Sequence, residues 1–292
     1  VIIARLPSLI GRVAIKAAKK FDRPYLVEVV GCPWDALWNH SWLGKIYAPY
    51  AYQALKRQVF RAPYVLYVTN KFLQRRYPTS GESVGVTDTV LAPQSDVILH
   101  KRMQSIDLLF NSDKPLTLGT AAGYDVKFKG QEYVIRAINQ LSERGLEAIY
   151  KPVGKGSGDR LKRIAKSNKV SDKVHFIGQL KHSEIFNYLD DIDVYIQPSR
   201  TEGLPRAVVE AMSRGCVVIG SDTGGIPELL DSSMIFKKRS TEELVEIITS
   251  LDRDKMKKEA RRNFNFSKQF SKELMDEKRK KFYDRFLKKN GL

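Results

Sequence analysis

The stretch from Ile192 to Glu228 constrains the fold of this chain more than any other. Its apolar runs at residues 194–196 and 216–219 predict two short buried strands. Between them, Pro205 suits the first position of a helix, where its missing N–H costs nothing, and Gly215 suits the end of that helix. A strand, a helix, a second strand and a glycine-rich turn form one unit of a parallel sheet. Ligands of such sheets bind beyond the carboxyl ends of the strands.

Two carboxylates stand out in this unit. Glu202 lies in the loop before the helix, and Glu210 lies one to two turns inside it, among mostly apolar neighbours. Burying a carboxylate is costly unless it has partners, and the two hydroxyl groups of a ribose are suitable partners. The alternative is that Glu210 pairs with Arg206 or Arg214 on a solvated helix face, because both lie four positions away.

The segment Glu202-Gly-Leu-Pro-Arg-Ala-Val-Val-Glu210 resembles the Glu-x7-Glu signature of retaining glycosyltransferases of family 4. Gln197-Pro-Ser before it, and Gly215 and Gly224-Gly-x-Pro-Glu-Leu after it, stand at that family's spacings. The resemblance is strong from Leu116 to Leu230 and looser elsewhere. The segment Glu-Gly-Leu-Pro-Arg-Ala is most similar to the corresponding segment of bacterial enzymes that build capsular polysaccharide or exopolysaccharide.

This resemblance implies an α/β protein of the GT-B fold, in which two Rossmann-like domains face a cleft. We expect an acceptor-side domain at 1–112, a donor-binding domain at 113–268 and a final helix at 269–292 that returns to the first domain. A strand starts at Val1 with no turn before it, so the first domain is expected to be incomplete at its N-terminus. In the second domain, apolar runs predict five strands, one of them at 174–178.

Lys127 and Lys129 lie just before a predicted helix, whose first N–H groups attract anions. In the family, a lysine at the position of Lys129 neutralises the departing diphosphate. Together with Gly203 and Leu204 at the helix start, it would stabilise that leaving group. An arginine usually stands about five positions before the lysine, where this chain has Tyr124. Two solvated loop lysines are the alternative interpretation.

A glycine-rich loop starts at Gly154, and glycine lets backbone amides approach an anion closely. Such a turn is also a common connector, so the pattern alone is weak evidence. The family closes this loop over the donor, which implies a binding role for Gly154. Gln179 and Leu180 match the position where the backbone of family members contacts the nucleotide base.

No metal or other cofactor is expected. Asp190-Asp-Ile-Asp193 looks like a metal-binding Asp-x-Asp, but it precedes a predicted strand, whereas the GT-B active site lies at the carboxyl ends of strands. Lysine and helix dipoles would neutralise the charge instead. The four histidines are not at metal-ligand spacing. Among them His40 is nine residues beyond Gly31, which occupies roughly the place of the family's active-site histidine.

A formal charge of +17 is compatible with nucleic acid, an anionic membrane surface or phosphorylated small molecules as partners. A basic nucleic-acid-binding protein is therefore one alternative, although no zinc finger, recognition helix or RNP-like pattern occurs. An inactive glycosyltransferase-like protein is another, because the family's arginine and histidine are missing. The two cysteines, Cys32 and Cys216, indicate no disulfide framework and favour a reducing cytoplasm.

The leading hypothesis is a retaining, metal-independent glycosyltransferase with a nucleotide-diphosphate sugar as donor, a UDP-sugar being favoured. Glu210 would hold the ribose, and Glu202 would position the sugar ring or its phosphate. The acceptor would be a growing saccharide or a lipid-linked saccharide in surface polysaccharide synthesis. The expected location is the cytoplasm, with the basic helix at Arg12–Lys20 touching the anionic inner face of the plasma membrane and no nucleic acid bound.

Overall fold

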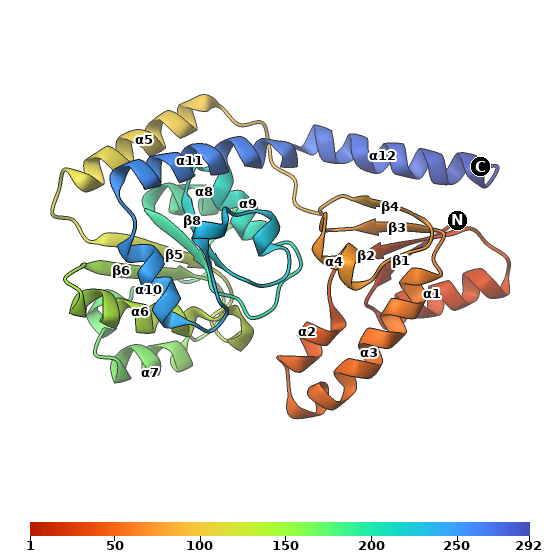
Figure 1. Cartoon of the computed structure of the whole chain (residues 1–292), viewed down its shortest axis with the longest axis horizontal. Helices are drawn as coiled ribbons and strands as arrows, with labels where there is room; N and C mark the ends of the chain where they lie inside the picture. The colour runs from red at the N-terminus through yellow and green to blue at the C-terminus, as the bar shows by residue number, and fades with distance from the viewer. The chain divides into compact units, whose positions relative to one another are not determined.

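A computed structural model describes all residues, Val1–Leu292, as two compact units, each built on its own parallel sheet (Figure 1). The first unit comprises Val1–Ala92, Thr201–Pro205 and Gln269–Leu292. The second comprises Pro93–Arg200 and Arg206–Lys268. None of the helices combines the length and the apolar run that crossing a bilayer requires.

The sheet of the first unit has four parallel strands in the order β1-β2-β3-β4. The strands are β1 (Ile2–Leu6), β2 (Tyr25–Val29), β3 (Tyr64–Tyr67) and β4 (Glu82–Gly85). The helices of this unit are α1 (Leu9–Lys20), α2 (Pro33–Trp38), α3 (Trp42–Phe60), α4 (Phe72–Arg76) and α12 (Lys272–Lys289). Figure 1 shows α1, α2 and α3 on one side of this sheet and α12 on the other.

Successive side chains of β3 point alternately into the two hydrophobic cores of this unit. Val65 and Tyr67 pack on the side of α1 and α3, whereas Tyr64 and Leu66 pack on the side of α12. The ring of Tyr64 contacts Phe282 and Phe286 of α12 edge-on. The C-terminal segment for which the sequence suggested a return to the first domain thus forms part of the first unit's core.

The sheet of the second unit has five parallel strands in the order β6-β5-β7-β8-β9. The strands are β5 (Leu116–Ala121), β6 (Ala148–Val153), β7 (Val194–Gln197), β8 (Val217–Ser221) and β9 (Ile235–Phe236). The α-helices are α5 (Asp96–Phe110), α6 (Gln131–Glu143), α7 (Asp159–Ser167), α8 (His182–Asp191), α9 (Arg206–Ser213), α10 (Thr241–Thr249) and α11 (Arg253–Ser267). The 3-10 helices of the chain are η1 (Lys127–Lys129), η2 (Ser171–Lys173), η3 (Ile226–Glu228), η4 (Ser232–Met234) and η5 (Lys268–Phe270). In Figure 1, α6, α7 and α10 lie on one face of the sheet, and α5, α8, α9 and α11 lie on the other.

The prediction of a strand at 174–178 was wrong. This segment makes only two isolated bridges to β6, Tyr150 to Val174 and Val153 to Gly178, and the fifth strand of the sheet is β9 instead. Pro152 of β6 has no N–H to donate, which interrupts the ladder between the bridges.

The compact units divide between Ala92 and Pro93, earlier in the chain than the boundary expected at 112/113. The reason is α5, a helix that the sequence analysis did not identify and that packs against α11 in the second unit. Its buried face includes Arg102, which donates to the carbonyl groups of Ile192 (2.7 Å) and Leu189 (2.6 Å). A buried arginine interrupts the apolar stripe by which such a helix is recognised.

Both cysteines, Cys32 and Cys216, are buried and unbridged. The sulfur of Cys32 lies 3.0 Å from the hydroxyl of Tyr77, and burial raises the pKa of the thiol to about 11. His40, in contrast, is exposed in the turn between α2 and α3.

Candidate functional site

Most of the predicted site residues follow strands of the second unit at one edge of its sheet. Lys127 and Lys129 follow β5, and Gly154 follows β6. Gln179 and Leu180 follow the bridged segment 174–178. Because all strands are parallel, their carboxyl ends meet at this edge, which is where α/β sheets bind ligands.

The two lysines form the ends of η1, and this turn lies against the loop that follows β7. The N–H of Arg200 donates to the carbonyl of Phe128 (2.7 Å). Gly130 ends the turn with φ 72°, and a Cβ added there would lie 2.0 Å from the carbonyl oxygen of Pro198. Only glycine therefore lets the turn and the loop approach so closely.

Arg200 supplies a cation at this turn that the sequence analysis missed. Its Nη2 donates to the carbonyl of Lys127 (2.5 Å) and lies 3.9 Å from the carboxylate of Glu132 in α6. Glu132 is only 7% exposed and also pairs with Arg160 of α7 at 3.3 Å. Arg200 is far from Lys129 in sequence, so a search for an arginine just before the lysine does not find it. The available signal is its place directly after a buried strand.

Tyr124, at the position where the family usually has arginine, has a structural role. It is buried, its hydroxyl donates to the carbonyl of Pro152 (2.9 Å) and it accepts from the N–H of Gly178 (2.8 Å). Burial raises the pKa of this hydroxyl. Tyr124 therefore ties the ends of β5, β6 and the 174–178 segment together.

The glycine-rich loop approaches the end of β5 closely. A Cβ on Gly154 would lie 2.0 Å from the carbonyl oxygen of Ala122, and the Gly154 N–H donates to Gly178 (2.9 Å). Further along, the N–H groups of Ser157 (3.1 Å) and Gly158 (3.3 Å) donate to the carboxylate of Asp125. Two amides of the predicted phosphate cradle thus bind a carboxylate of the chain itself.

Glu210 is buried, as its apolar neighbours predicted. It is 7% exposed, and its Oε1 lies 3.2 Å from Nε2 of His182, at the start of α8. The alternative of a solvated pair with Arg206 or Arg214 is wrong, because the buried Glu210 pairs with His182 and Arg214 pairs with Asp190. His182 was missed as a neighbour of Glu210 because 28 residues separate the two in sequence.

Glu202, Gly203 and Leu204 group with the first compact unit, within the segment Thr201–Pro205. The two acids of the Glu-x7-Glu signature therefore belong to different units, since Glu210 lies in the second.

Four buried polar atoms around the carboxyl edge of the second sheet have no hydrogen-bond partner. They are Oε1 of Gln131, Nε of Arg160, Nε of Arg200 and Oγ1 of Thr223. They lie in segments that follow β5, β6, β7 and β8, respectively. Buried polar groups in proteins are nearly always paired, so these atoms are available to a ligand or to water.

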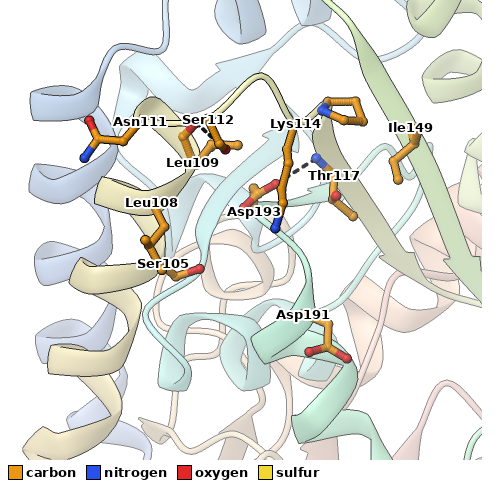
Figure 2. Close-up of a pocket in the computed structure, with 11 residues that line it drawn as sticks. Ser105, Leu108, Leu109, Asn111, Ser112, Lys114, Thr117, Ile149, Asp191 and Asp193 are labelled. Atoms are coloured by element: carbon orange, nitrogen blue, oxygen red, sulfur yellow. Dashed lines mark hydrogen bonds between the residues drawn. The ribbon is translucent and has the colours of Figure 1, made fainter.

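The run Asp190–Asp193 lies at the opposite, amino edge of the same sheet. Asp190 pairs with Arg214, whereas Asp193 accepts from the N–H of Thr117 (2.8 Å), and burial raises the pKa of Asp193. Asp191 and Asp193 line a cavity together with Lys114 and Thr117 (Figure 2). The volume of this cavity is about 450 Å³. No group of three or more His, Cys, Asp or Glu side chains is placed to hold a metal ion.

Sequence comparison identifies the family. The profile of the family "Glycosyl transferases group 1" matches residues 106–268, more than half of the chain. The chain belongs to this glycosyltransferase family.

Two relatives illustrate the family. Protein CapJ from Staphylococcus aureus is 32% identical over 250 residues, which cover 85% of this chain and 61% of CapJ. The putative colanic acid biosynthesis glycosyltransferase WcaL from Escherichia coli is 35% identical over 111 residues, 36% of this chain and 27% of WcaL. The chain thus spans less than two thirds of the length of either relative.

Solved structures confirm the predicted GT-B fold class with its two parallel-sheet α/β domains. Sucrose-phosphate synthase from Thermosynechococcus elongatus has a TM-score of 0.75 at 17% identity, covering 95% of this chain and 71% of its own. Anabaena HepE in complex with UDP has a TM-score of 0.71 at 16% identity, covering 97% of this chain and 78% of its own. At these identities the likeness establishes the fold alone.

Proposed function

We propose that this protein is a retaining glycosyltransferase of family 4 that takes its sugar from a nucleotide-diphosphate donor, a UDP-sugar being favoured. The acceptor is a growing saccharide or a lipid-linked saccharide in the synthesis of a surface polysaccharide, in the cytoplasm. Family membership supports the reaction class. The relatives support a role in polysaccharide synthesis, since WcaL is named for colanic acid biosynthesis and TuaC of Bacillus subtilis for teichuronic acid biosynthesis. The complexes of HepE with UDP and with UDP-glucose support the choice of a UDP-sugar as the donor.

The observation that carries this proposal is the cationic turn η1 held at the carboxyl edge by Arg200. Arg200 contacts the turn through its backbone and its guanidinium, and its buried Nε has no partner within the chain. An inactive protein was an alternative because the family's arginine before Lys129 and its active-site histidine are both missing. Arg200 brings a guanidinium to this turn from another strand end, which favours an active enzyme.

In the proposed mechanism, catalysis is mainly electrostatic. Negative charge grows on the β-phosphate as the bond to the sugar breaks, so fixed cations beside it stabilise the transition state more than the ground state. Lys129 supplies a compact charge, and Arg200 supplies a planar guanidinium that suits phosphate oxygens. Gly203 and Leu204 would add backbone N–H groups, Glu202 would position the sugar ring or its phosphate, and no metal is required for these roles.

Glu210 would hold the donor through its ribose. A ribose has two adjacent hydroxyl groups, both of which can donate to one carboxylate. Burial of Glu210 favours this assignment, because a desolvated carboxylate gains more from such donors than a solvated one. Lys127, Gly154, Gln179 and Leu180 complete the proposed donor contacts.

Calorimetric titration with UDP, GDP and ADP at about 0.15 M salt tests the proposal, because exposed charges are largely screened there. We expect saturable binding of UDP and weaker or no binding of the other two nucleotides. A duplex DNA titration is the control. Salt-sensitive binding of DNA without binding of any nucleotide would contradict the donor assignment and favour a nucleic-acid partner.

A further inference from the structure

Asp125 lies in the connection between β5 and α6 (122–130), four residues before Lys129, and its side chain reaches a different loop. The carboxylate accepts from the N–H of Ser157 through Oδ2 (3.1 Å) and from the N–H of Gly158 through Oδ1 (3.3 Å). Because each oxygen accepts from its own amide, the glycine-rich loop at 154–158 fixes both the place and the orientation of this carboxylate.

Main-chain hydrogen bonds join the same two segments. Beyond the ends of β5 and β6, the N–H of Ala122 donates to the carbonyl of Val153 (2.9 Å), and the N–H of Tyr124 donates to the carbonyl of Lys155 (2.9 Å). These bonds continue the parallel ladder of the two strands. The side chain of Asp125 adds the next contacts in the same direction. The connection and the glycine-rich loop are thus joined along their length.

The loop folds closely around the carboxylate, and its glycines make this possible. Gly156 has φ 128°, and a Cβ added there would lie 2.5 Å from Oδ2 of Asp125. Gly158 has φ 67°. Glycine adopts such positive φ values readily because it has no Cβ. A side chain at position 156 would therefore push the carboxylate away from the loop.

The start of α7 explains why the loop needs this acceptor. In a capping box, an acid at the third helical position accepts from the N–H of the N-cap residue. The N-cap of α7 is Gly158, which has no side chain, and the third position is the buried Leu161. Asp125 accepts from the Gly158 N–H in place of the missing acid. The cap of α7 therefore lies on the connection that carries Lys129.

The path from Asp125 to Lys129 is short and tightly turned. The N–H of Val126 donates to the carbonyl of Gly123 (3.3 Å), and the N–H of Lys129 donates to the carbonyl of Val126 (3.0 Å). Arg200 holds the same turn from the loop that follows β7. Because the backbone is bonded at each step, a displacement of Asp125 is passed on to Lys129.

We propose that Asp125 is a positioning residue for glycosyl transfer. It couples the glycine-rich loop to the η1 turn, so that the loop and the ammonium group of Lys129 meet the diphosphate of the donor as one preformed unit. Asp125 acts through Lys129 and does not itself bind the donor, because amides occupy both of its oxygens and a carboxylate repels phosphate. The inference rests on the proposed function, which places Lys129 beside the β-phosphate.

Titration calorimetry with UDP and UMP tests the positioning. UDP carries on its β-phosphate the charge that develops on the leaving group, so its affinity reports on the place of Lys129, whereas UMP lacks this phosphate. Asp125→Ala should weaken UDP binding about tenfold and UMP binding less than about twofold. Asp125→Asn keeps one oxygen that can accept from the loop, so it should weaken UDP binding by about threefold or less.

Hydrogen exchange of the nucleotide-free chain tests the coupling without a ligand. In Asp125→Ala, the amides of Ser157 and Gly158 should exchange about five- to tenfold faster, and so should those of the η1 turn, because the two segments lose their link. Gly156→Ala breaks the same contact from the side of the loop. It should therefore give the same pattern of exchange and of nucleotide affinity.

Asp252→Ala is the matched control. Like Asp125, Asp252 is exposed and accepts from an amide at the start of a helix, here the N–H of Lys255 in α11 (2.7 Å). Its loss should lower stability to urea about as much as Asp125→Ala does. The UDP affinity and the exchange of the η1 turn should stay those of the parent chain.

Two results would overturn the inference. Faster exchange confined to the loop and the first turn of α7, with an unchanged UDP affinity, would make Asp125 a helix cap only. Equal weakening of UDP and UMP binding would mean that the substitution does not act at the β-phosphate. A parent chain that binds no UDP would instead contradict the proposed function, and the exchange measurement would still decide whether Asp125 holds the η1 turn.

Discussion

Two buried carboxylates at the start or within the first turns of helices, Glu132 in α6 and Glu210 in α9, are equally exposed, at 7% each. Their partners differ. Glu132 lies between the guanidinium groups of Arg160 and Arg200, at 3.3 and 3.9 Å. Glu210 has one ionisable neighbour, His182, whose side chain is mostly exposed to solvent.

The difference indicates a division of roles. A carboxylate between two permanent cations is balanced within the chain and holds their positions, here those of Arg200 and the η1 turn. A buried carboxylate with one exposed imidazole is less fully compensated, so it gains more from a ligand that donates hydrogen bonds. We therefore expect Glu132 to act on stability and Glu210 on ligand binding.

The largest expected effect is on folding. Glu132→Gln leaves two partly buried guanidinium groups without a counter-charge and should lower the free energy of unfolding by about 2–3 kcal/mol. Urea denaturation measures this loss. Glu147→Gln, which removes an exposed partner of Lys173, is the control and should change stability by less than about 0.5 kcal/mol. Equal losses in the two variants would mean that Glu132 has no special structural role.

Glu210→Gln should weaken ligand binding and leave the stability almost unchanged. Loss of the carboxylate charge that we propose to bind the ribose should weaken UDP binding about tenfold to a hundredfold, equivalent to about 1.4–2.8 kcal/mol. The free energy of unfolding should change by less than about 1 kcal/mol, because the substitution keeps the shape of the side chain. Titration calorimetry checks the affinity, with the exposed Glu246→Gln of α10 as control. An unchanged affinity would refute the ribose assignment.

Arg200→Lys tests whether the guanidinium itself matters at the η1 turn. The substitution keeps the charge but loses the planar guanidinium, whose Nη2 contacts both Lys127 and Glu132, so kcat should fall about tenfold, which is about 1.4 kcal/mol. KM should change less, because the effect falls on the transition state. Arg160→Lys removes the other guanidinium beside Glu132 and should leave kcat within about twofold. An equal fall in kcat for both variants would assign the effect to Glu132 and not to Arg200.

The smallest expected effect concerns His182. Its bond to Glu210 is open to solvent, so His182→Gln should weaken UDP binding only about two- to threefold, less than about 1 kcal/mol. His175→Gln, an exposed histidine on the bridged segment, is the control. A loss as large as that of Glu210→Gln would show that the carboxylate acts through the imidazole, and the contrast with Glu132 would then fail.

Apolar periodicity predicted most of the regular elements, and it failed where a polar side chain or a proline overrides it. The strands β7 and β8 lie close to the ranges predicted at 194–196 and 216–219, and α9 lies between Pro205 and Gly215 as predicted. The buried Arg102 interrupts the apolar pattern of α5, so this helix was not predicted. Pro152 of β6 cannot donate a hydrogen bond, so the segment 174–178 forms two isolated bridges and not the predicted strand. Arg102 bonds to residues far from α5 in sequence, and Pro152 lies on β6, the neighbour of the segment 174–178. A local sequence pattern contains neither relation.

By itself, the sequence determined that this protein is a parallel α/β chain of a glycosyltransferase family and that Glu202 and Glu210 flank a helix start. Strand and helix periods, caps and a continuous motif act over a few neighbouring residues, so they can be recognised along the chain. Only the tertiary structure decided the partners: Arg200 with Glu132, His182 with Glu210, and Asp125 with the loop after Gly154. These pairs are separated by tens of residues, and they meet because the order of the strands in the sheet brings their carboxyl ends to one edge.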